Sequence, residues 1–449
     1  MSITPADRKA CRGFLLSWKS RSDHLPLIVK GARQIGKTSS IEHFSETYGH
    51  FVEINFVTEP QYRKIFDKSF KTDDVVKEIT LLDPEKKFVA GDTLLFFDEL
   101  QSCPNCATSL KFFKQDGRYD VICSGSLMGI NYNEIESNSV GFKEEYEMFS
   151  LDFEEFLWAN GYSDSQIDDL YFHMRELQPF TNLEMDVMME LFRNYMVVGG
   201  MPAIVDAFVE QKNFSGILRK QKMLLISYEE DITKYAQGLD KGKIKNVYAN
   251  IPAFLAKDNK KFQISKIARN ARTRDYVGTA EWLQDSGIVN ICYCLDAPEM
   301  PFRGNYNPAN YKIYFADTGL LIASLDEESQ VDLRANRNFN TCKGAIYENV
   351  VAETLVKSGY KLFFYRNEKS TVEMDFFIRD AESVVPVEVK ASNNASASLC
   401  NLIEKDKYPE VKYGIKLCDR NIGFNGKFYT FPYFLSFLLH RYMMDKIKK

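Results

Sequence analysis

The sequence predicts an α/β protein in which a parallel-sheet domain comes first, a helical subdomain and a winged helix-turn-helix follow, and a smaller α/β domain ends the chain. Near the start, short runs that are apolar at every position alternate with helix-like stretches, which is typical of strands buried on both faces of a parallel sheet. The middle of the chain is helical in pattern and rich in Leu, Met and Phe. The last part again alternates helix-like and strand-like segments.

These changes of pattern divide the chain into four expected segments. The chain has 449 residues, and a length prior alone suggests about three domains. We expect the parallel-sheet core over 1–150, the helical subdomain over 151–240, the winged helix-turn-helix over 241–325 and the last α/β domain over 326–449.

Composition excludes several classes of protein. With 45% hydrophobic and 27% charged residues, the chain is neither collagen-like nor disordered. Its net charge of -5 provides no global attraction to nucleic acid or to a membrane, so any basic surface must be local. No apolar run approaches the ~20 residues of a membrane span, and no signal-peptide core follows the start. The nine cysteines lack the spacing of a disulfide framework. We therefore expect a cytoplasmic protein without a membrane partner.

The elements of the first two segments follow from local pattern. Apolar runs predict strands at Leu27–Val29, Phe51–Phe56, Thr93–Phe97 and Val121–Cys123. From about residue 152 to 237 the pattern is helical, with one break at Val198–Pro202, where paired glycines and a proline must interrupt a helix.

The first predicted strand leads into a phosphate-binding sequence. Gly31-Ala32-Arg33-Gln34-Ile35-Gly36-Lys37-Thr38 matches G-x-x-x-x-G-K-[ST], and a helical run follows from Ser39. Such glycines let backbone N–H groups face a β-phosphate; Lys37 can bridge the β- and γ-phosphates, and Thr38 can ligate Mg²⁺. A glycine turn that binds nothing is disfavoured, because strand, loop and helix occur in the required order. The sequence therefore predicts a P-loop NTPase sheet that binds ATP and Mg²⁺ through residues 31–39.

Two further strand ends carry residues suited to the same site. Thr93–Phe97 runs into Asp98 and Glu99. Asp98 would hold Mg²⁺, and Glu99 would polarise the attacking water as a catalytic residue beside Lys37. Taken alone, such a pair is equally compatible with a solvated loop start. Another strand ends at Ser124-Gly125-Ser126, where Ser124 can sense the γ-phosphate, although a plain Ser-Gly turn fits as well.

Motifs along nearly the whole chain resemble one family. They are Gly31–Thr38, Phe97–Gln101, Ser124–Ser126, Ser150–Leu157, Val198–Pro202 and Phe315–Leu320. Together they resemble the AAA+-type ATPases of bacteria and archaea that carry an uncharacterised C-terminal domain. The resemblance implies a nucleotide-binding core, a helical lid, a winged helix and a nuclease-like C-terminal domain, and a homo-oligomer is compatible with it. Arg118 is our candidate for the arginine finger of such ATPases; an ordinary surface arginine is the alternative.

The last segment places acidic residues on neighbouring elements. Glu348 lies on a helix predicted over 345–357. The runs 373–378 and 384–389 read as neighbouring strands, and Lys390 follows the second. Because side chains alternate along a strand, Glu388 and Lys390 point to one face, and Asp375 can join them.

This Asp…Glu-x-Lys arrangement with a helical Glu resembles the restriction-endonuclease-like superfamily. Asp375, Glu388 and Glu348 would hold Mg²⁺, which polarises a scissile phosphate. Lys390 would position or activate the water and stabilise the charge that develops. A surface ion pair, or a fold retained after activity is lost, is the alternative.

The third segment is the most basic part of the chain. Residues 241–274 contain ten basic residues and one acid, Asp258. The predicted elements are helices at Ile244–Ala256, Ser265–Ala271 and Arg274–Asp285, with strands at Phe262–Ile264 and Ile288–Leu295. Such charge on a winged helix suits contacts with duplex phosphates, and the Arg274–Asp285 helix would enter the major groove. A winged helix that contacts only protein is the alternative.

Other reactive residues form no recognisable site. Cys103 and Cys106 have C-x-x-C spacing, but no second pair lies at workable spacing for zinc, so ordinary thiols are expected. The leading interpretation is an ATP-dependent DNA-processing protein in which nucleotide state controls a nuclease-like domain. The alternative is an ATP-driven regulatory switch whose nuclease-like domain is inactive and only binds protein or nucleic acid.

Overall fold

The computed structural model divides into two compact units, which are described separately. It describes residues 8–126, 139, 141–236, 241–255, 276, 278–325, 327–335, 337, 342–367, 372–390, 396–404 and 407–447. The first unit holds the residues up to Ser150 together with Asp285–Gly287, and the second holds Leu151–Gln284 and the residues from Ile288 onward.

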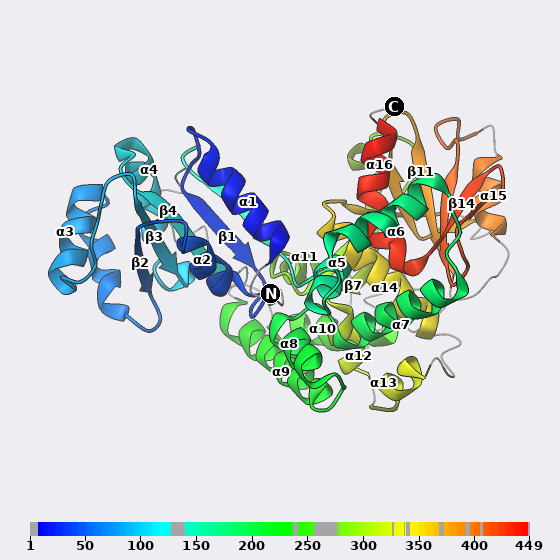
Figure 1. Ribbon diagram of the computed structural model, residues 1–449, viewed down its shortest axis with the longest axis horizontal. Coiled ribbons are helices and arrows are strands. Elements are labelled where there is room, and N and C mark those ends of the chain that lie inside the picture. Colours follow the sequence, from blue (N-terminus) through cyan, green and yellow to red (C-terminus); the bar gives the residue numbers. More distant parts are fainter. Residues whose placement is uncertain are drawn as a thin grey trace. The chain divides into compact units, whose positions relative to one another are not determined.

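The first unit is built on a parallel sheet with the strand order β2-β3-β4-β1-β5 (Figure 1). Its strands are β1 (Leu27–Gly31), β2 (His50–Asn55), β3 (Thr93–Asp98), β4 (Asp120–Ser126) and β5 (Glu144–Met148). Its helices are α1 (Lys9–Ser20), α2 (Lys37–Ser45), α3 (Thr72–Leu82) and α4 (Cys106–Asp116), with short 3₁₀ helices at Pro60–Asp67 and Leu100–Ser102. Every residue of β3 is buried, as a central strand covered on both faces requires. The predicted α/β class is confirmed.

The edge strand β5 lacks an apolar run and is absent from the sequence prediction. Among the described strands it pairs with β1 alone, and it reads Glu-Glu-Tyr-Glu-Met, of which Met148 alone is buried. Lys30 on β1 lies 2.8 Å from Glu145, and Arg21 lies 2.5 Å from Glu144. Because ion pairs hold this edge strand, it can form without a continuous apolar run, so a search for apolar runs does not find it.

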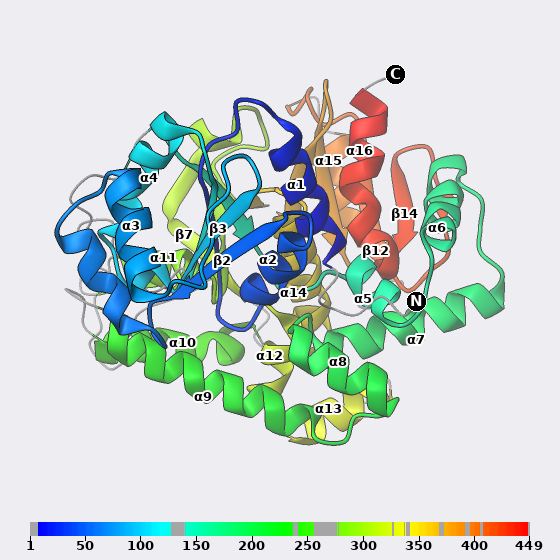
Figure 2. The same cartoon turned by 60° about the vertical axis from the view of Figure 1, so that its left-hand side comes forward.

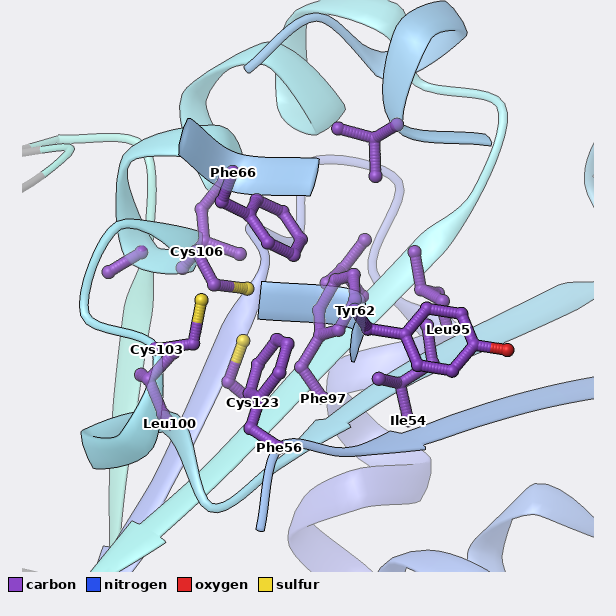
Figure 3. Close-up of a cluster of buried hydrophobic side chains, with 14 of the residues drawn as sticks. Ile54, Phe56, Tyr62, Phe66, Leu95, Phe97, Leu100, Cys103, Cys106 and Cys123 are labelled. Carbon is purple, nitrogen blue, oxygen red and sulfur yellow. The ribbon is translucent and has the colours of Figure 1, made fainter. Parts of the chain in front are cut away.

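One face of this sheet is covered by an aromatic and sulfur-rich cluster (Figure 3). The Phe97 ring packs 5.7 Å from Phe56. Cys103, Cys106 and Cys123 are buried in the same cluster, and their sulfur atoms point into it in Figure 3. All three are free thiols, so the C-x-x-C pair contributes to the core as expected.

The second unit begins with helices and ends with two sheets. Its helices are α5 (Phe153–Ala159), α6 (Asp164–Glu176), α7 (Asn182–Val198), α8 (Pro202–Gln211), α9 (Ile217–Tyr235), α10 (Lys241–Leu255), α11 (Thr279–Asp285), α12 (Thr318–Ala323), α13 (Glu327–Arg334), α14 (Cys342–Lys357), α15 (Ala397–Ile403) and α16 (Leu439–Ile447), with a 3₁₀ helix at Tyr433–Leu438. The break predicted at residues 198–202 is confirmed, because α7 ends at Val198 and α8 begins at Pro202.

Two sheets make up the rest of the second unit. The strands are β6 (Val289–Leu295), β7 (Tyr306–Phe315), β8 (Leu362–Arg366), β9 (Glu373–Met374), β10 (Phe376–Arg379), β11 (Val384–Val389), β12 (Gly414–Cys418), β13 (Gly423–Phe424) and β14 (Phe428–Pro432). One sheet has the order β7-β6-β8-β9 and the other β10-β11-β12-β14-β13.

This topology changes the interpretation of the expected wing. The strand predicted at Ile288–Leu295 is β6, and it pairs in parallel with β8 besides its antiparallel partner β7. It is therefore an inner strand of a four-stranded sheet and not half of an isolated hairpin. The boundary expected near residue 325 falls between strands of that one sheet. The helix predicted over 265–271 and the strand over 262–264 lie outside the described residues.

Three motifs have no assigned role in the sequence, namely Ser150–Leu157, Val198–Pro202 and Phe315–Leu320. They meet where α5, α7, α8 and α12 of the second unit pack together (Figure 2). Gly200 donates a hydrogen bond to Asp317 (2.7 Å), and its carbonyl oxygen accepts one from Leu151 (2.7 Å). A Cβ on Gly200 would lie 2.0 Å from the Leu151 carbonyl oxygen, and one on Gly319 would lie 2.6 Å from the Gly199 nitrogen. Glycine is required at both positions because backbone approaches backbone.

A buried carboxylate completes this junction. Glu353 on α14 accepts hydrogen bonds from Tyr195 (2.9 Å), Lys357 (2.6 Å) and both the amide (2.8 Å) and the hydroxyl (2.6 Å) of Thr318. Burial and the nearby Glu353 charge together raise the pKa of Asp317 to about 6, although Lys357 opposes the shift. Each carboxylate is tolerated because donors surround it.

Replacing Gly200 with alanine tests the close approach. Gly200→Ala must displace the Leu151 carbonyl group, so we expect it to lower the free energy of unfolding by at least about 2 kcal/mol. The matched control is Gly344→Ala on α14, where an added Cβ meets nothing within 4 Å; it should be neutral or stabilising by less than about 1 kcal/mol. Thermal and urea unfolding followed by circular dichroism measure both. Equal midpoints for the two variants would contradict the packing described.

The buried thiols give a second test. Burial raises the pKa of Cys103 to about 12 and also raises the pKa of Cys106. Among the cysteines whose burial the structure describes, we expect N-ethylmaleimide at pH 8 to modify the half-buried Cys400 first and to leave Cys103, Cys106 and Cys123 unmodified until the protein unfolds. Peptide mass spectrometry over a time course measures this order. Modification of Cys103 at the rate of Cys400 would show that the cluster is open.

Candidate functional site

The phosphate-binding loop has the backbone its sequence predicts. β1 ends at Gly31, and α2 begins at Lys37. Gly36 has φ 87° and Gln34 has φ 61°, both in the left-handed region that lets the loop curl. A Cβ on Gly31 would lie 2.3 Å from the Met148 carbonyl oxygen of β5, so only glycine fits there. The loop is thereby held between β1 and the edge strand.

The loop side chains differ in exposure. Ala32 and Ile35 are buried and pack inward, Gln34 and Ser39 are exposed, and Arg33 is half-buried. The residues that the sequence assigns to phosphate therefore form one continuous turn at the carboxyl end of β1.

Lys37 folds back over this turn. Its ammonium group donates hydrogen bonds to the carbonyl oxygens of Ala32 (2.8 Å) and Gly31 (3.2 Å). Burial lowers the pKa of Lys37 to about 8, while the charges of Glu99 and Asp98 oppose that shift. The ammonium is thus held inside the loop, where a phosphate would lie.

The Asp98 carboxylate is the centre of this site. Its Oδ2 accepts hydrogen bonds from the Thr38 hydroxyl (3.1 Å) and from the Asn55 amide (3.0 Å), and its Oδ1 accepts one from Ser124. Asp98 and Ser124 are buried. The two residues predicted to hold Mg²⁺ thus contact each other, and their oxygen atoms are ligands that this ion prefers. Asn55, at the end of β2, was missed because nothing in its local sequence marks it.

Glu99 follows directly in an unusual conformation. It has φ 58°, and the Gln101 amide donates a hydrogen bond to its carboxylate. Gln101 also accepts a hydrogen bond from the Ser126 amide at 3.3 Å. Glu99 is therefore held between two strand ends by Gln101, which the sequence did not identify as a functional residue.

Arg118 lies away from this site in its own unit. It precedes the amino end of β4, whereas the loop lies at the carboxyl ends of the parallel strands. Its guanidinium donates hydrogen bonds to Asp116 (2.7 Å) and to Asp73. Two carboxylates of the same unit thus engage the arginine, and its role as a finger remains a prediction.

In the second unit, the strand predicted over residues 373–378 is interrupted at Asp375. β9 ends at Met374 and pairs with β8, whereas β10 begins at Phe376 and pairs with β11. Asp375 stands where the chain passes from one sheet to the other, and its Oδ2 accepts a hydrogen bond from the Val389 amide (2.8 Å). The carboxylate is thereby tied to the end of β11.

Glu388 and Lys390 lie at that end of β11, as predicted. The Lys390 ammonium is 3.0 Å from Glu388 Oε1. Burial would lower the pKa of Lys390, but the charges of Glu388, Asp375 and Glu348 raise it instead. All four predicted residues therefore share one electrostatic environment. Glu388 Oε2 is buried and has no hydrogen-bond partner among the described residues.

A second lysine occupies the same environment. Lys312 on β7 lies 3.1 Å from Glu348 and 3.1 Å from Glu373. The Tyr314 hydroxyl donates to the same Glu348 oxygen as Lys312. Burial would lower the pKa of Lys312, but Glu348, Glu373 and Asp375 raise it above its ordinary value. Lys312 belongs to none of the motifs in the sequence, although a charged residue inside the run Tyr-Lys-Ile-Tyr-Phe is a signal.

The sheet register adds a third lysine. Glu388 lies opposite Lys416 of β12, and Lys416 lies opposite Thr430 of β14. Paired residues of parallel strands face the same side, and Lys416 is buried. The environment of Glu388 is thus rich in cations.

Two of the three predicted ligands, Glu388 and Asp375, have carboxylate oxygens placed suitably for a metal ion. Glu388 offers a buried oxygen that lacks a donor, and Asp375 lies beside the same strand end. For Glu348, Lys312 and Tyr314 already contact one oxygen. In the described part of the chain, the one group of three His, Cys, Asp or Glu side chains whose ligand atoms all lie within 4.8 Å of one another is Asp169, His173 and Glu184, far from these residues in sequence.

The basic segment is described only in part. α10 confirms the helix predicted from residue 244, while 256–275 and 277 lie outside the described residues. Of the helix predicted over Arg274–Asp285 to enter a major groove, residues 274, 275 and 277 lie there too, and the described remainder includes α11 (Thr279–Asp285). Within the described ranges, no helix has the length and apolarity to cross a membrane.

Comparison with known proteins supports the first unit most clearly. An AAA domain model matches residues 23–157. Residues 189–331 match the domain of unknown function DUF8612, and residues 343–434 match the domain of unknown function DUF4143. No curated protein sequence is similar enough to count as a relative.

Solved structures resemble the chain only distantly. A Walker-type ATPase of Pyrococcus abyssi is 14% identical with a TM-score of 0.41, and the match covers 71% of this chain and 95% of that chain. The Orc1 protein of Aeropyrum pernix in complex with DNA is 10% identical with a TM-score of 0.30, covering 75% and 94%. The RuvB Holliday junction branch migration motor of Thermotoga maritima is 14% identical with a TM-score of 0.27, covering 63% and 87%. Loop, strand ends and domain match together identify the first unit as an AAA-type P-loop domain.

Proposed function

We propose that the chain binds and hydrolyses ATP in its first unit and that the nucleotide state controls a metal-dependent, nuclease-like site in its second unit that acts on DNA. The observation that carries the first half of this proposal is the contact between Asp98 and Thr38 (3.1 Å) directly behind the loop. A hydroxyl at a helix start beside a strand-end carboxylate is the pair that holds Mg²⁺ in P-loop sites.

The residues of the first site have distinct roles in this proposal. Bound Mg²⁺ would neutralise phosphate charge, and Thr38 and Asp98 would hold it. Backbone N–H groups of the loop bind phosphate oxygens, and Lys37 exchanges its two carbonyl partners for phosphate. Glu99 orients a water, and the Gln101 amide holds the Glu99 carboxylate in place. Ser124 donates a hydrogen bond to Asp98, so a contact between Ser124 and the γ-phosphate would also affect the Asp98 carboxylate.

The second site suits phosphodiester hydrolysis. Asp375 and Glu388 would hold a divalent ion, which would polarise the scissile phosphate. Lys390, about one third exposed, is free to turn from Glu388 toward a phosphate oxygen or a water. The buried, donorless oxygen of Glu388 supports this half of the proposal.

The covalent connection between the units supports coupling. Arg8 donates hydrogen bonds to the carbonyl oxygens of Ile35 in the loop and of Phe149, both at 2.7 Å. Two residues later, Leu151 accepts a hydrogen bond from Lys357 (2.8 Å) in the core of the second unit. A change in the loop on nucleotide binding therefore has a short covalent path into that core.

Two arguments bear on the DNA partner and on the alternative. The excess of basic residues over 241–274 supports a phosphate-rich partner. The lysines beside Glu348 and Glu388 favour the alternative, in which the second unit is an inactive binding module of an ATP-driven switch, because they balance carboxylate charge without metal.

Variants of the first site separate binding from hydrolysis. Lys37→Ala removes a phosphate contact and should weaken ATP binding by about ten- to a hundredfold. Glu99→Gln should bind ATP normally and hydrolyse it at least about a hundredfold more slowly. Exposed Lys87→Ala and Glu85→Gln are matched controls that should leave both unchanged. Fluorescent nucleotide titration and phosphate release measure the two steps. Wild-type turnover by Glu99→Gln would remove Glu99 from the proposed role.

Variants of the second site separate the nuclease from the switch. With Mn²⁺ and ATP, wild type should cleave double-stranded DNA, and Asp375→Asn and Glu388→Gln should each reduce cleavage at least about a hundredfold. Glu382→Gln, exposed and paired with Lys412, is the control that should cleave normally. Gel assays measure cleavage, with circular dichroism to verify folding. An absence of cleavage by wild type, combined with intact ATP turnover, would favour the switch.

A further inference from the structure

We propose that the Lys312 ammonium is a built-in cation that takes the place of one metal ion in the second-unit site, so that Glu348 pairs with this lysine and takes no part in holding metal, and a single divalent ion binds between Asp375 and Glu388. The inference rests on the proposed function in one respect, namely that the site takes a divalent ion. It differs from the sequence-based expectation, in which Glu348 is itself a metal ligand.

The position of Lys312 is fully enclosed. It lies on β7, and its side chain is 2% exposed, compared with 31% for Lys390. The ammonium stands 3.1 Å from carboxylate oxygens of Glu348 and of Glu373 and 4.8 Å from the centre of the Phe364 ring. An ammonium that is removed from water in this way is retained only where anions compensate for its lost hydration.

Lys312 contacts one carboxylate oxygen of each of its two acidic partners, Glu348 and Glu373. Glu348 Oε1 accepts from Lys312 and from Tyr314 together. Glu373 uses one oxygen for Lys312 and lies 3.6 Å from Arg366 through the other. The Lys312 ammonium therefore already bridges the helix α14 and the strand β9, and it does so at the Oε1 atom of Glu348.

The other side of the site is different. Glu388 has one oxygen against Lys390 and one buried oxygen that has no hydrogen-bond partner in the described part of the chain. Lys390 follows the last residue of β11, and its side chain is partly in solvent, so it can move away. A divalent ion can therefore bind the buried Glu388 oxygen near Asp375. It cannot bind the Glu348 oxygen that Lys312 contacts unless the lysine moves away.

Replacing the internal cation with a neutral side chain should change the number of bound metal ions. Lys312→Gln removes the positive charge that compensates Glu348 and Glu373, so a second divalent ion should replace the ammonium. All measurements use the nucleotide-free full chain with Thr38→Ala, which weakens the loop site and is called the parent. Adding Lys312→Gln should lower the thermal midpoint relative to this parent. The midpoint of this variant should rise more with Mn²⁺, and it should bind one more Mn²⁺ per chain, counted from the electron paramagnetic resonance signal of free Mn²⁺.

Three controls make the result specific. Lys361→Gln, an exposed lysine of the same unit, should bind Mn²⁺ like the parent. Lys312→Arg keeps a cation and should not gain the additional ion. The double variant Lys312→Gln, Glu348→Gln should lose the gain.

A second variant avoids dependence on the folding of Lys312→Gln. Glu348→Gln alone should bind Mn²⁺ with the parent's stoichiometry and affinity within about twofold, because no metal uses Glu348 while Lys312 is present. Loss of affinity of roughly tenfold or more in Glu348→Gln would overturn the inference, since removal of even a supporting group of a metal site costs that much. Equal Mn²⁺ uptake by Lys312→Gln and the parent would overturn it as well. These readouts do not require cleavage, so failure of the nuclease proposal is recognised separately.

Discussion

A carboxylate that leaves water must find donors or a cation inside the fold, and this constraint organises both units of the protein. Asp98 is buried and satisfied by Thr38, Ser124 and an amide from the neighbouring strand end. In the second unit Glu353 accepts hydrogen bonds from a tyrosine, a lysine and a threonine, and Glu348 accepts them from a lysine and a tyrosine. Each arrangement draws together elements that are distant in sequence.

The same constraint explains motifs that carry no chemistry of their own. The glycines at 199, 200 and 319 let the backbone approach so closely that Asp317 can receive the Gly200 amide. Removing a donor from such a carboxylate leaves it buried and unpaired, which costs more than an ordinary lost contact. Sequence segments of this kind can be retained for the polar junction rather than for a substrate.

The first site was largely predictable from the sequence because its information is local. A loop of fixed spacing follows a strand, and β3 ends in Asp98 and Glu99, so strand geometry brings the two together. Asn55 and Gln101 were not predictable in the same way, because their roles depend on which strand lies beside which. β5 was missed because an edge strand can be held by ion pairs instead of an apolar face.

The second site was predicted in composition but not in arrangement. Glu388 and Lys390 follow strand alternation, but Asp375 lies at a crossing between two sheets that no local pattern indicates. Lys312 enters through β7, which belongs to the same sheet as β8 and β9. The sequence pattern predicts a winged helix-turn-helix for this part of the chain, because parallel pairing of β6 with a strand seventy residues away cannot be read from periodicity.

The most direct test of the account is a crystal structure of the full chain with Mn²⁺ and a non-hydrolysable ATP analogue, in which anomalous scattering locates every manganese ion. The account predicts one peak beside Thr38 and Asp98 at the analogue's phosphates and one between Asp375 and Glu388, with Lys312 still bound to Glu348. Absence of the peak beside Thr38 and Asp98 would contradict the ATP site. A manganese ion ligated by Glu348 in place of Lys312, or no ion at Asp375 and Glu388, would contradict the organisation of the second site.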